Sequence, residues 1–563
     1  MRSAWARLPA VVAALSGVLL PSPVGAGDDV GGITAPGHRV RYLVPPSPLV
    51  QSDGLALDGQ GGLFVTVALF NRIVRLDLAT KAVTVIADET DAEPLLVPDD
   101  ITMGPDGNFY VTELLGRRVT RISPDGKQRK VLATNIGDGG TGANGIAFNA
   151  QGRLFATDLS FADPSHPGGL WEIDPAGIKP AVPIARPLPT PEGFGFGPDG
   201  LAYVPEMFDG RIDVIDVDAR TVRPLVDGFG YLVALKVDHQ GRLVVLETDK
   251  GKVWRVDRTS GARTFLAQGP PGLDNLVVDR DGTIYVSSFA QGNIWRVNEA
   301  AGALEPLLAD RSLTVPCSLS EAEDGSLVVG DFTAVARVGN GGGVERLNRL
   351  LVSGLQLLTP GAVQLGSGLY YTDFLPPQGR LFRRDLTTGK RELVADGFGF
   401  PWHVRAGPDG HLLVSDQALG IVFAVDLGTG LRTPVVQGLR SPSGLAFDGE
   451  RGVVYVSDTG GGRVLAVAFT GGNPSVVASG LTGPEGVAVD RDGSLLVVEG
   501  DAGNLVRLDP AGGGRTVVAT GLPTRTVGFG VPLMNYSSDV LVRRDGSIVV
   551  SGDADGSLVE LSR

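Results

Sequence analysis

Residues 272–282 read GLDNLVVDRDG, and close copies of this stretch recur along the whole chain. Four of the copies are SDGLALDGQGG at 52–62, ANGIAFNAQG at 143–152, PSGLAFDGERG at 442–452 and PEGVAVDRDG at 484–493. Twelve such units follow one another at a mean spacing of about 44 residues, which is typical of a repeat architecture. The shared pattern predicts the fold, and departures from it mark candidate sites.

Each unit alternates apolar and polar residues over four short runs that are separated by Asp-x-x-Gly or Pro-Asp-Gly turns. This alternation predicts half-buried strands, since successive side chains of a strand point to opposite faces. Four antiparallel strands per unit, repeated around an axis, form a β-propeller blade. We therefore predict an all-β fold of twelve four-stranded blades, with no convincing helix after the N-terminal segment.

The two ends of the chain predict how the blades are grouped. Residues 38–44 (HRVRYLV) resemble the fourth strand of a unit, and the C-terminal GSLVELSR at 556–563 resembles a third strand. A cut near Asn298 yields two pieces with the same organisation, and each piece can pair its first strand with its last blade. Because propellers typically have four to eight blades, we predict tandem six-bladed propellers at 27–299 and 300–563.

Residues 1–26 are predicted to be a signal peptide. Arg2 and Arg7 precede a mostly apolar run at 8–20, and Val-Gly-Ala at 24–26 is a small-residue cleavage site. The apolar run is shorter than the ~20 residues that a bilayer span needs. We therefore expect an exported protein, periplasmic or secreted, without a membrane span.

Charge and cysteine content narrow the range of partners. Removal of two arginines with the signal peptide changes the formal charge from −14 to −16, which argues against nucleic acid as a partner. Cys317 is the single cysteine of the sequence, so an intramolecular disulfide is impossible. We expect a monomer, because a ring that closes on itself needs no strand from a partner.

An acidic residue ends the second strand of most units. Taken singly, each could be a catalytic carboxylate, but recurrence in nearly every blade favours a structural role as acceptor of backbone N–H groups. The acids concerned are Glu113, Asp158, Glu206, Glu247, Asp331, Asp373, Asp416, Asp458 and Glu499.

The residue at the head of each first strand varies between the two halves, and this position lies at the mouth of the central channel. In the second half the heads are small, apolar or mixed, namely Cys317, Gly361, Trp402, Ser443, Glu485 and Ser538. In the first half they are mainly acids and amides, namely Asp53, Asp99 followed by Asp100, Asn144, Glu192, Val233, and Asp274 followed by Asn275. Crowded carboxylates repel one another unless a cation lies among them, and oxygen ligands suit a hard cation. The alternative is that these residues cap the strands or bind channel water.

At these positions the sequence resembles the SMP-30/gluconolactonase family and the related paraoxonase-type arylesterases. Asp274-Asn275 resembles the Asp-Asn pair of the arylesterases' last blade, and Asn144-Gly145 matches an Asn-Gly motif of the family. The resemblance covers 38–299 and implies a metal site, with calcium expected first and magnesium or zinc as alternatives. Its ligands would be Asp53, Asn144, Glu192, Asp274 and Asn275. Two departures are Glu192 in place of an expected Asn and Asp53 in place of a Glu.

The resemblance implies a metal-dependent hydrolase that acts on a lactone or an ester. Asp99 or Asp100 is the candidate base, and His166, in the long loop at 158–169, is a further catalytic candidate. The second half resembles NHL-type propellers, which leaves open a non-catalytic alternative that binds a protein or glycan around a structural cation. A third hypothesis is a streptogramin-lyase-like enzyme, suggested by the unit at 105–126, although the catalytic histidine pattern of that family is missing.

Overall fold

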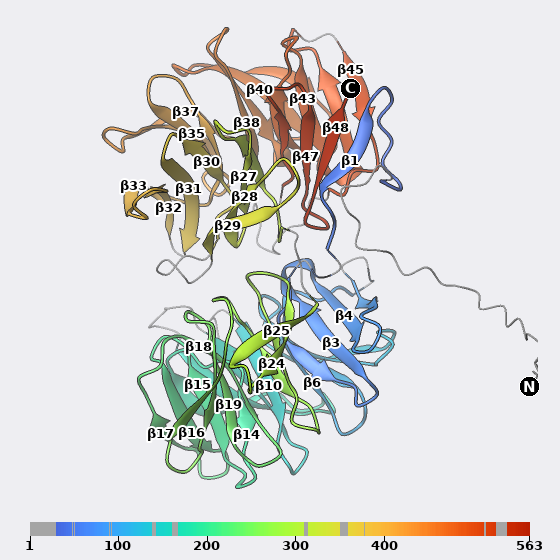
Figure 1. Cartoon of the computed structure of the whole chain (residues 1–563), viewed down its shortest axis with the longest axis vertical. Helices are drawn as coiled ribbons and strands as arrows, with labels where there is room; N and C mark the ends of the chain where they lie inside the picture. The colour runs from blue at the N-terminus through green and yellow to red at the C-terminus, as the bar shows by residue number, and fades with distance from the viewer. Residues whose placement is uncertain are drawn as a thin grey trace, which may run out of the picture.

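The computed structural model describes residues 30–563 apart from 48, 50, 89–90, 92, 138–141, 160–166, 309–312, 350–357, 376–377, 512–513 and 525–536. The predicted signal peptide at 1–26 and the candidate residue His166 lie outside the described residues. Figure 1 shows two bodies, one above the other; the lower body runs from blue to yellow-green, and the upper body holds the yellow-to-red part of the chain together with the blue strand β1 (Arg39–Val44).

The lower body, ring 1, consists of six sets of four antiparallel strands. The last two sets are joined into one eight-stranded sheet by a single parallel bridge between Gln268 and Ala303. The sets are β2 (Leu55–Leu57), β3 (Gly62–Val67), β4 (Arg72–Asp77) and β5 (Val83–Ala87); β6 (Pro98–Met103), β7 (Phe109–Glu113), β8 (Arg118–Ile122) and β9 (Arg129–Thr134); β10 (Gly142–Phe148), β11 (Leu154–Leu159), β12 (Gly168–Ile173) and β13 (Val182–Leu188); β14 (Gly195–Phe196), β15 (Ala202–Glu206), β16 (Arg211–Asp216) and β17 (Thr221–Val226); β18 (Leu232–Val237), β19 (Leu243–Glu247), β20 (Lys252–Val256) and β21 (Arg263–Gln268); β22 (Leu276–Val278), β23 (Ile284–Ser287), β24 (Ile294–Asn298) and β25 (Ala303–Leu308).

The upper body, ring 2, also consists of six four-stranded sheets. They are β26 (Ser318–Glu321), β27 (Leu327–Asp331), β28 (Ala334–Val338) and β29 (Val344–Arg349); β30 (Ala362–Leu365), β31 (Gly368–Leu375), β32 (Gln378–Asp385) and β33 (Arg391–Phe398); β34 (Pro401–Ala406), β35 (His411–Asp416), β36 (Ile421–Asp426) and β37 (Arg432–Gln437); β38 (Pro442–Asp448), β39 (Val453–Asp458), β40 (Arg463–Ala468) and β41 (Ser475–Ser479); β42 (Pro484–Val489), β43 (Leu495–Glu499), β44 (Asn504–Leu508) and β45 (Arg515–Ala519); β46 (Val540–Val542), β47 (Ile548–Gly552), β48 (Ser557–Ser562) and β1 (Arg39–Val44).

The first strands of the sets form two closed circles. In ring 1, β2, β6, β10, β14, β18 and β22 contact one another in that order, and β22 contacts β2 again. In ring 2 the same holds for β26, β30, β34, β38, β42 and β46. The tandem propeller architecture predicted from the repeat is therefore present, and the first strand of each set lines a central channel.

The strand that closes ring 2 differs from the expectation. β1 was expected to complete the first ring, but it pairs with β48, with Arg39 opposite Ser562, and its blue ribbon lies beside the red strands in Figure 1. Ring 1 is instead completed by β25, which pairs with β24. The turn between β24 and β25 spans only residues 299–302, so this hairpin closes a far shorter loop than β1 would. Ring 1 is thus an insertion between the first strand of ring 2 and the remainder of ring 2.

One buried apolar cluster joins the two rings. Leu69 and Phe70 lie in the turn after β3, at the same end of ring 1 as Asp53, while Trp402 is a head residue of ring 2. The mouths of both channels therefore open toward the contact between the rings. The buried members of the cluster are Leu49, Leu55, Leu63, Val65, Val67, Leu69, Phe70, Val74, Leu76, Ile294, Val315, Cys317, Phe332, Phe400 and Trp402.

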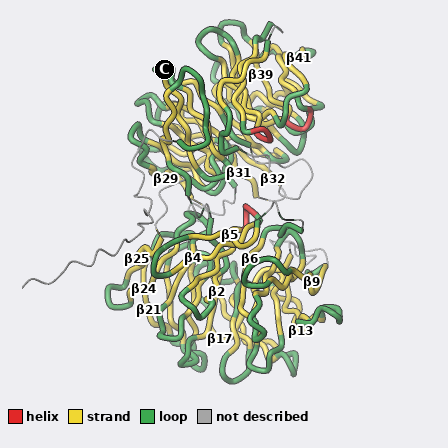
Figure 2. Tube along the Cα trace, turned by 90° about the vertical axis from the view of Figure 1, so that its right-hand side faces the viewer, coloured by secondary structure: helices red, strands yellow, loops and turns green. Residues whose placement is uncertain are grey.

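Helical structure is confined to three single 3-10 turns in the part of the chain that the structure describes, drawn red in Figure 2. They are η1 (Ala68–Phe70), η2 (Thr459–Gly461) and η3 (Gly500–Ala502). None of the described helices has the length and apolar character needed to cross a bilayer.

Candidate functional site: the channel of ring 1

The head residues of ring 1 lie at one level of the channel because the strands share one register. The backbone N–H of Asp53 donates to Thr66 O at 3.0 Å, and that of Asp274 donates to Ser287 O at 3.1 Å. In both pairs the head residue bonds to the second strand of its own blade. The carboxyls of Asp53, Asp99, Glu192 and Asp274 meet at this level and influence one another electrostatically.

Burial and mutual repulsion raise the pKa of these four carboxyls above their usual range. For Asp53 the causes are burial and then the charges of Asp274 and Asp99, and a hydrogen bond links its carboxyl to that of Asp274. Burial and the charge of Asp274 raise the pKa of Asp99. Burial and Asp99 raise the pKa of Glu192, although a hydrogen bond from Asn144 opposes that shift. These groups therefore take up protons or require a cation.

The donor chemistry of this mouth suits a hard cation, since Asp53, Asn144, Glu192 and Asp274 offer carboxylate and amide oxygens. The side chains as they stand are not gathered around one point: among the described residues no group of three or more His, Cys, Asp or Glu has the geometry of a metal site. The four residues fit a divalent cation by their chemistry and by their unbalanced charge.

Asp100 and Asn275 belong to a different group, deeper in the channel. Asp100 Oδ2 accepts from Lys236 Nζ at 2.9 Å and from the N–H of Ile146 at 3.1 Å. Asp100 Oδ1 accepts from Asn275 Nδ2 at 3.0 Å and from the N–H of Ile101 at 2.9 Å. Both carboxylate oxygens are thus occupied in a fully buried position. We therefore leave Asp100 and Asn275 out of the mouth group and retain Asp99 as its candidate base.

Asp100 and Lys236 come from opposite sides of the ring, three blades apart, and their ion pair crosses the channel. We call it the transverse ion pair. It lies between the mouth and the other end of the channel.

Ring 2 also has an ion pair that crosses its channel. Asp539 Oδ2 accepts from Arg405 Nη2 at 3.0 Å and from the N–H of Leu319 at 2.8 Å, and Arg405 again lies three blades away. His403 Nε2 lies 2.9 Å from the same oxygen, while its Nδ1 has no partner in the described residues. Burial lowers the pKa of His403, so the imidazole is neutral near pH 7 and donates from Nε2.

From the sequence, Asp100 and Asn275 were named as residues that follow their head residues, but the same position was not compared in every blade, so His403, Asp539 and the cations Lys236 and Arg405 were missed. The residue after the head is glycine in six of the twelve units: a Cβ at Gly54 would lie 2.4 Å from Asp99 O, and one at Gly444 would lie 2.3 Å from Glu485 O. The same comparison at this position would have singled out Asp100, Ala234, Asn275, Ser318, His403 and Asp539. A bond from the N–H of Gly361 to Thr372 Oγ1 also places Gly361 at this position, so that the head of its blade is Pro360.

The recurring acids at the ends of the second strands are structural, as predicted. Seven of the nine accept a backbone N–H from the segment that leads into the first strand of their own blade, at 2.6–3.2 Å, in the pairs Leu96–Glu113, Thr190–Glu206, Gly230–Glu247, Thr314–Asp331, Gly399–Asp416, Arg440–Asp458 and Thr482–Glu499. Asp158 accepts from Trp171 Nε1 at 2.6 Å, and Asp373 forms an ion pair with Arg380. Burial raises the pKa of Glu206 to about 8.

A family model described as an SMP-30/gluconolactonase/LRE-like region matches residues 371–530. This segment lies in ring 2, whereas the motifs that carried the resemblance in the sequence lie in ring 1. A search of curated proteins finds no significant match.

Solved structures similar to this chain include a gluconolactonase from Xanthomonas campestris, at 20% identity and a TM-score of 0.39, covering 51% of this chain and 99% of that one. A virginiamycin B lyase from Staphylococcus aureus matches at 14% identity and a TM-score of 0.37, covering 56% and 98%. The tricorn protease matches at 14% identity and a TM-score of 0.35, covering 92% and 63%. Residues 371–530, within the second propeller, are thus similar to the SMP-30/gluconolactonase/LRE-like region.

Proposed function

We propose that this chain is an exported hydrolase of a lactone or an ester and that the reaction takes place at the mouth of ring 1. A divalent cation, calcium first, would be held there by Asp53, Asn144, Glu192 and Asp274. The observation that supports this proposal most is a set of four interacting carboxyls, two buried (Asp53, Glu192) and two half-buried (Asp99, Asp274), whose pKa values are all raised. Such an arrangement costs free energy unless a cation balances it.

A bound cation would polarise the substrate carbonyl and stabilise the oxyanion that forms from it. Asp99 is the base of the proposed reaction, because it is only half-buried and because burial and the charge of Asp274 raise its pKa, which makes its carboxylate a stronger base. It would take a proton from a water molecule whose oxygen attacks the carbonyl carbon. When the ester C–O bond breaks, the leaving oxygen would receive that proton. Asn144 would position Glu192 through the hydrogen bond between them.

A second candidate function is a binding propeller without catalysis, for a protein or glycan partner. It is favoured by the position of the family match in ring 2, away from the carboxyl mouth of ring 1. In that case the carboxyls would hold a structural cation or shared protons.

The test is hydrolysis of a panel of lactones and esters by the full-length protein, with calcium and with a chelator. We expect turnover that requires the cation and that falls at least about 100-fold in Asp274→Asn and Asp99→Asn. The matched control is Glu485→Gln, which changes a head carboxyl of ring 2 and should leave turnover within about twofold of wild type. No turnover on the panel would support the binding propeller, whereas turnover that is unchanged in Asp274→Asn would rule out the mouth of ring 1 as the place of the reaction.

A thermal melt of the same proteins separates the two candidates further. A calcium-dependent rise in Tm that disappears in Asp274→Asn, without any turnover, assigns a structural cation. No rise in wild type removes the cation from both candidates.

A further inference from the structure

The end of the ring 1 channel opposite the mouth opens into a cavity of about 510 Å³, which we call the funnel. It is lined by the last residues of the six first strands, and apolar side chains such as Met103, Phe148, Phe196 and Val278 share the wall with polar backbone and with the charged side chains of Asp58, Lys236, Asp279 and Arg280. A concave, largely apolar space with few polar groups and a volume of about 300–1,000 Å³ is typical of a small-molecule site.

Lys236 closes the inner end of the funnel and supplies its one lysine. The side chain lines the cavity, is 17% exposed, and reaches up the channel to Asp100. An ammonium group carries three N–H donors, whereas Asp100 Oδ2 is its single recorded acceptor within the described residues. Two N–H donors of the Lys236 ammonium group therefore remain available at the base of the cavity.

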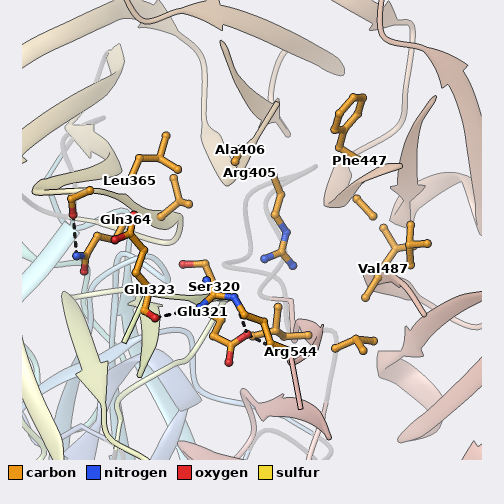
Figure 3. A pocket seen from close by; sticks show the side chains of 17 residues that line it. Ser320, Glu321, Glu323, Gln364, Leu365, Arg405, Ala406, Phe447, Val487 and Arg544 are labelled. Carbon is orange, nitrogen blue, oxygen red and sulfur yellow. Dashed lines mark hydrogen bonds and ion pairs between the residues drawn. The ribbon is translucent and has the colours of Figure 1, made fainter. Parts of the chain in front are cut away.

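In the matching funnel of ring 2, about 540 Å³ in volume, the cation of the ion pair has more acceptors around it than Lys236 has in ring 1. Figure 3 shows Arg405 reaching into it, with Ser320, Glu321 and Arg544 nearby. Arg405 Nε donates to Leu445 O at 3.0 Å, Nη1 donates to Leu319 O, and Nη2 donates to Asp539. All three nitrogens of this guanidinium already have acceptors. Two acids line each funnel, Asp58 and Asp279 in ring 1 and Glu321 and Glu323 in ring 2. The two funnels are similar in volume. They differ in that Lys236 has N–H donors without acceptors, whereas every nitrogen of Arg405 has an acceptor.

We propose that the funnel of ring 1 binds a small monocarboxylate with an apolar body, such as a medium-chain fatty acid or an arylalkanoic acid. The carboxylate accepts hydrogen bonds from the free donors of Lys236, and the apolar body packs against Met103, Phe148 and Phe196. Charge-assisted hydrogen bonds of this kind are about twice as strong as neutral ones and fix the orientation of the ligand. The proposal does not depend on hydrolysis at the mouth, because the transverse ion pair lies between the two sites.

The experiment is isothermal titration of the full-length protein with octanoate and, separately, with octan-1-ol. We expect saturable binding of one octanoate per chain, and affinity for the alcohol weaker by about tenfold or more. Ala147→Trp places a bulky side chain in the funnel without altering the ion pair and should weaken octanoate binding about tenfold or more. Leu541→Trp, a half-buried lining residue of the ring 2 funnel, is the matched control and should leave binding within about twofold.

Lys236→Met tests the charge directly and should lower octanoate affinity to that of the alcohol. Because this change leaves Asp100 without its cation, its fold is checked by circular dichroism, and Ala147→Trp decides the matter if the variant does not fold. The proposal is overturned if octanoate does not bind at millimolar concentration or if the alcohol binds equally well. It is also overturned if Leu541→Trp, and not Ala147→Trp, removes binding.

Discussion

Ring 1 holds the carboxylate of Asp100 with Lys236 from the opposite side of its channel, and ring 2 holds Asp539 with Arg405 in the same way. The mouths above these ion pairs differ. Ring 1 brings four carboxyls together, whereas the heads of ring 2 include Cys317, Trp402 and two serines. The two rings thus share an ion pair across the channel but have different head residues at the mouth. Functional residues are therefore expected at the positions where the two rings differ.

The largest effect should come from removing the strand that makes ring 2 dependent on the N-terminus. Deletion of residues 30–48 takes β1 away from β48 and removes the buried side chains of Leu43 and Val44, each worth about 1.5–3 kcal/mol. We expect ring 2 to lose its cooperative melting transition and ring 1 to keep its own. Differential scanning calorimetry of the deletion variant measures both transitions.

The control for that prediction is a fragment of residues 49–308, whose strands pair entirely within it. This fragment should melt at the temperature of ring 1 in the full chain. A synthetic peptide of residues 30–48 should restore the ring 2 transition of the deletion variant. Loss of the ring 1 transition on deletion of β1 would contradict the strand assignment.

Breaking the transverse ion pairs should have the next largest effect. Asp100→Ala leaves Lys236 without its partner, and Asp539→Ala leaves Arg405 and His403 without theirs, so each should lower the free energy of unfolding of its own ring by about 3–5 kcal/mol. Urea denaturation followed by hydrogen exchange in each ring measures the loss. An equal loss in both rings from either variant would show that the rings unfold as one unit.

The two rings should respond to pH in opposite directions. In folded ring 1 the pKa values are raised for Asp53, Asp99, Glu192 and Asp274. Above a pH of about 4 the folded ring therefore still binds protons that the unfolded chain has released, so the stability of ring 1 falls as pH rises. For Glu206 this loss continues to a pH of about 8, and Glu206→Gln should remove that part. Each unit of pKa shift corresponds to about 1.4 kcal/mol.

In ring 2 the sign is reversed. Burial lowers the pKa of His403; burial alone would raise the pKa of Asp539, but Arg405 and His403 lower it. The unfolded chain then binds protons that folded ring 2 does not, so stability falls as pH drops below about 6.5 and again below about 4. Hydrogen exchange at pH 4, 6 and 8 in the presence of a chelator measures the stability of each ring separately. Parallel pH profiles would refute the assignment of opposite charge environments.

The smallest effect concerns the glycines that follow the head residues. A Cβ at Gly444 in ring 2 would lie 2.3 Å from Glu485 O, so Gly444→Ala should destabilise the protein by about 1–3 kcal/mol. At Gly193 in ring 1 the nearest atom is Val233 O at 3.4 Å, an ordinary contact. Gly193→Ala should therefore be neutral or stabilise by up to about 1 kcal/mol. Thermal melts of the two variants side by side check this difference.

The sequence alone determined the strands, the propeller architecture and the structural role of the recurring acids. Period-two alternation and fixed turn residues repeat in every unit, and such local signals are independent of distant parts of the chain. The head residues were also found in this way, since repetition makes a deviation such as Asp53 or Asp274 visible. The burial that raises their pKa could only be expected in general terms.

Only the tertiary structure decided which strand closes each ring and which charges meet. The sequence of β1 fits either ring, and the choice depends on the short turn that lets β25 pair with β24. Asp100 and Lys236 are separated by 136 residues, and a repeat pattern does not reveal that their blades lie opposite each other around a circle. Pairing across a channel depends on ring closure, which is a property of the whole chain and not of any one unit.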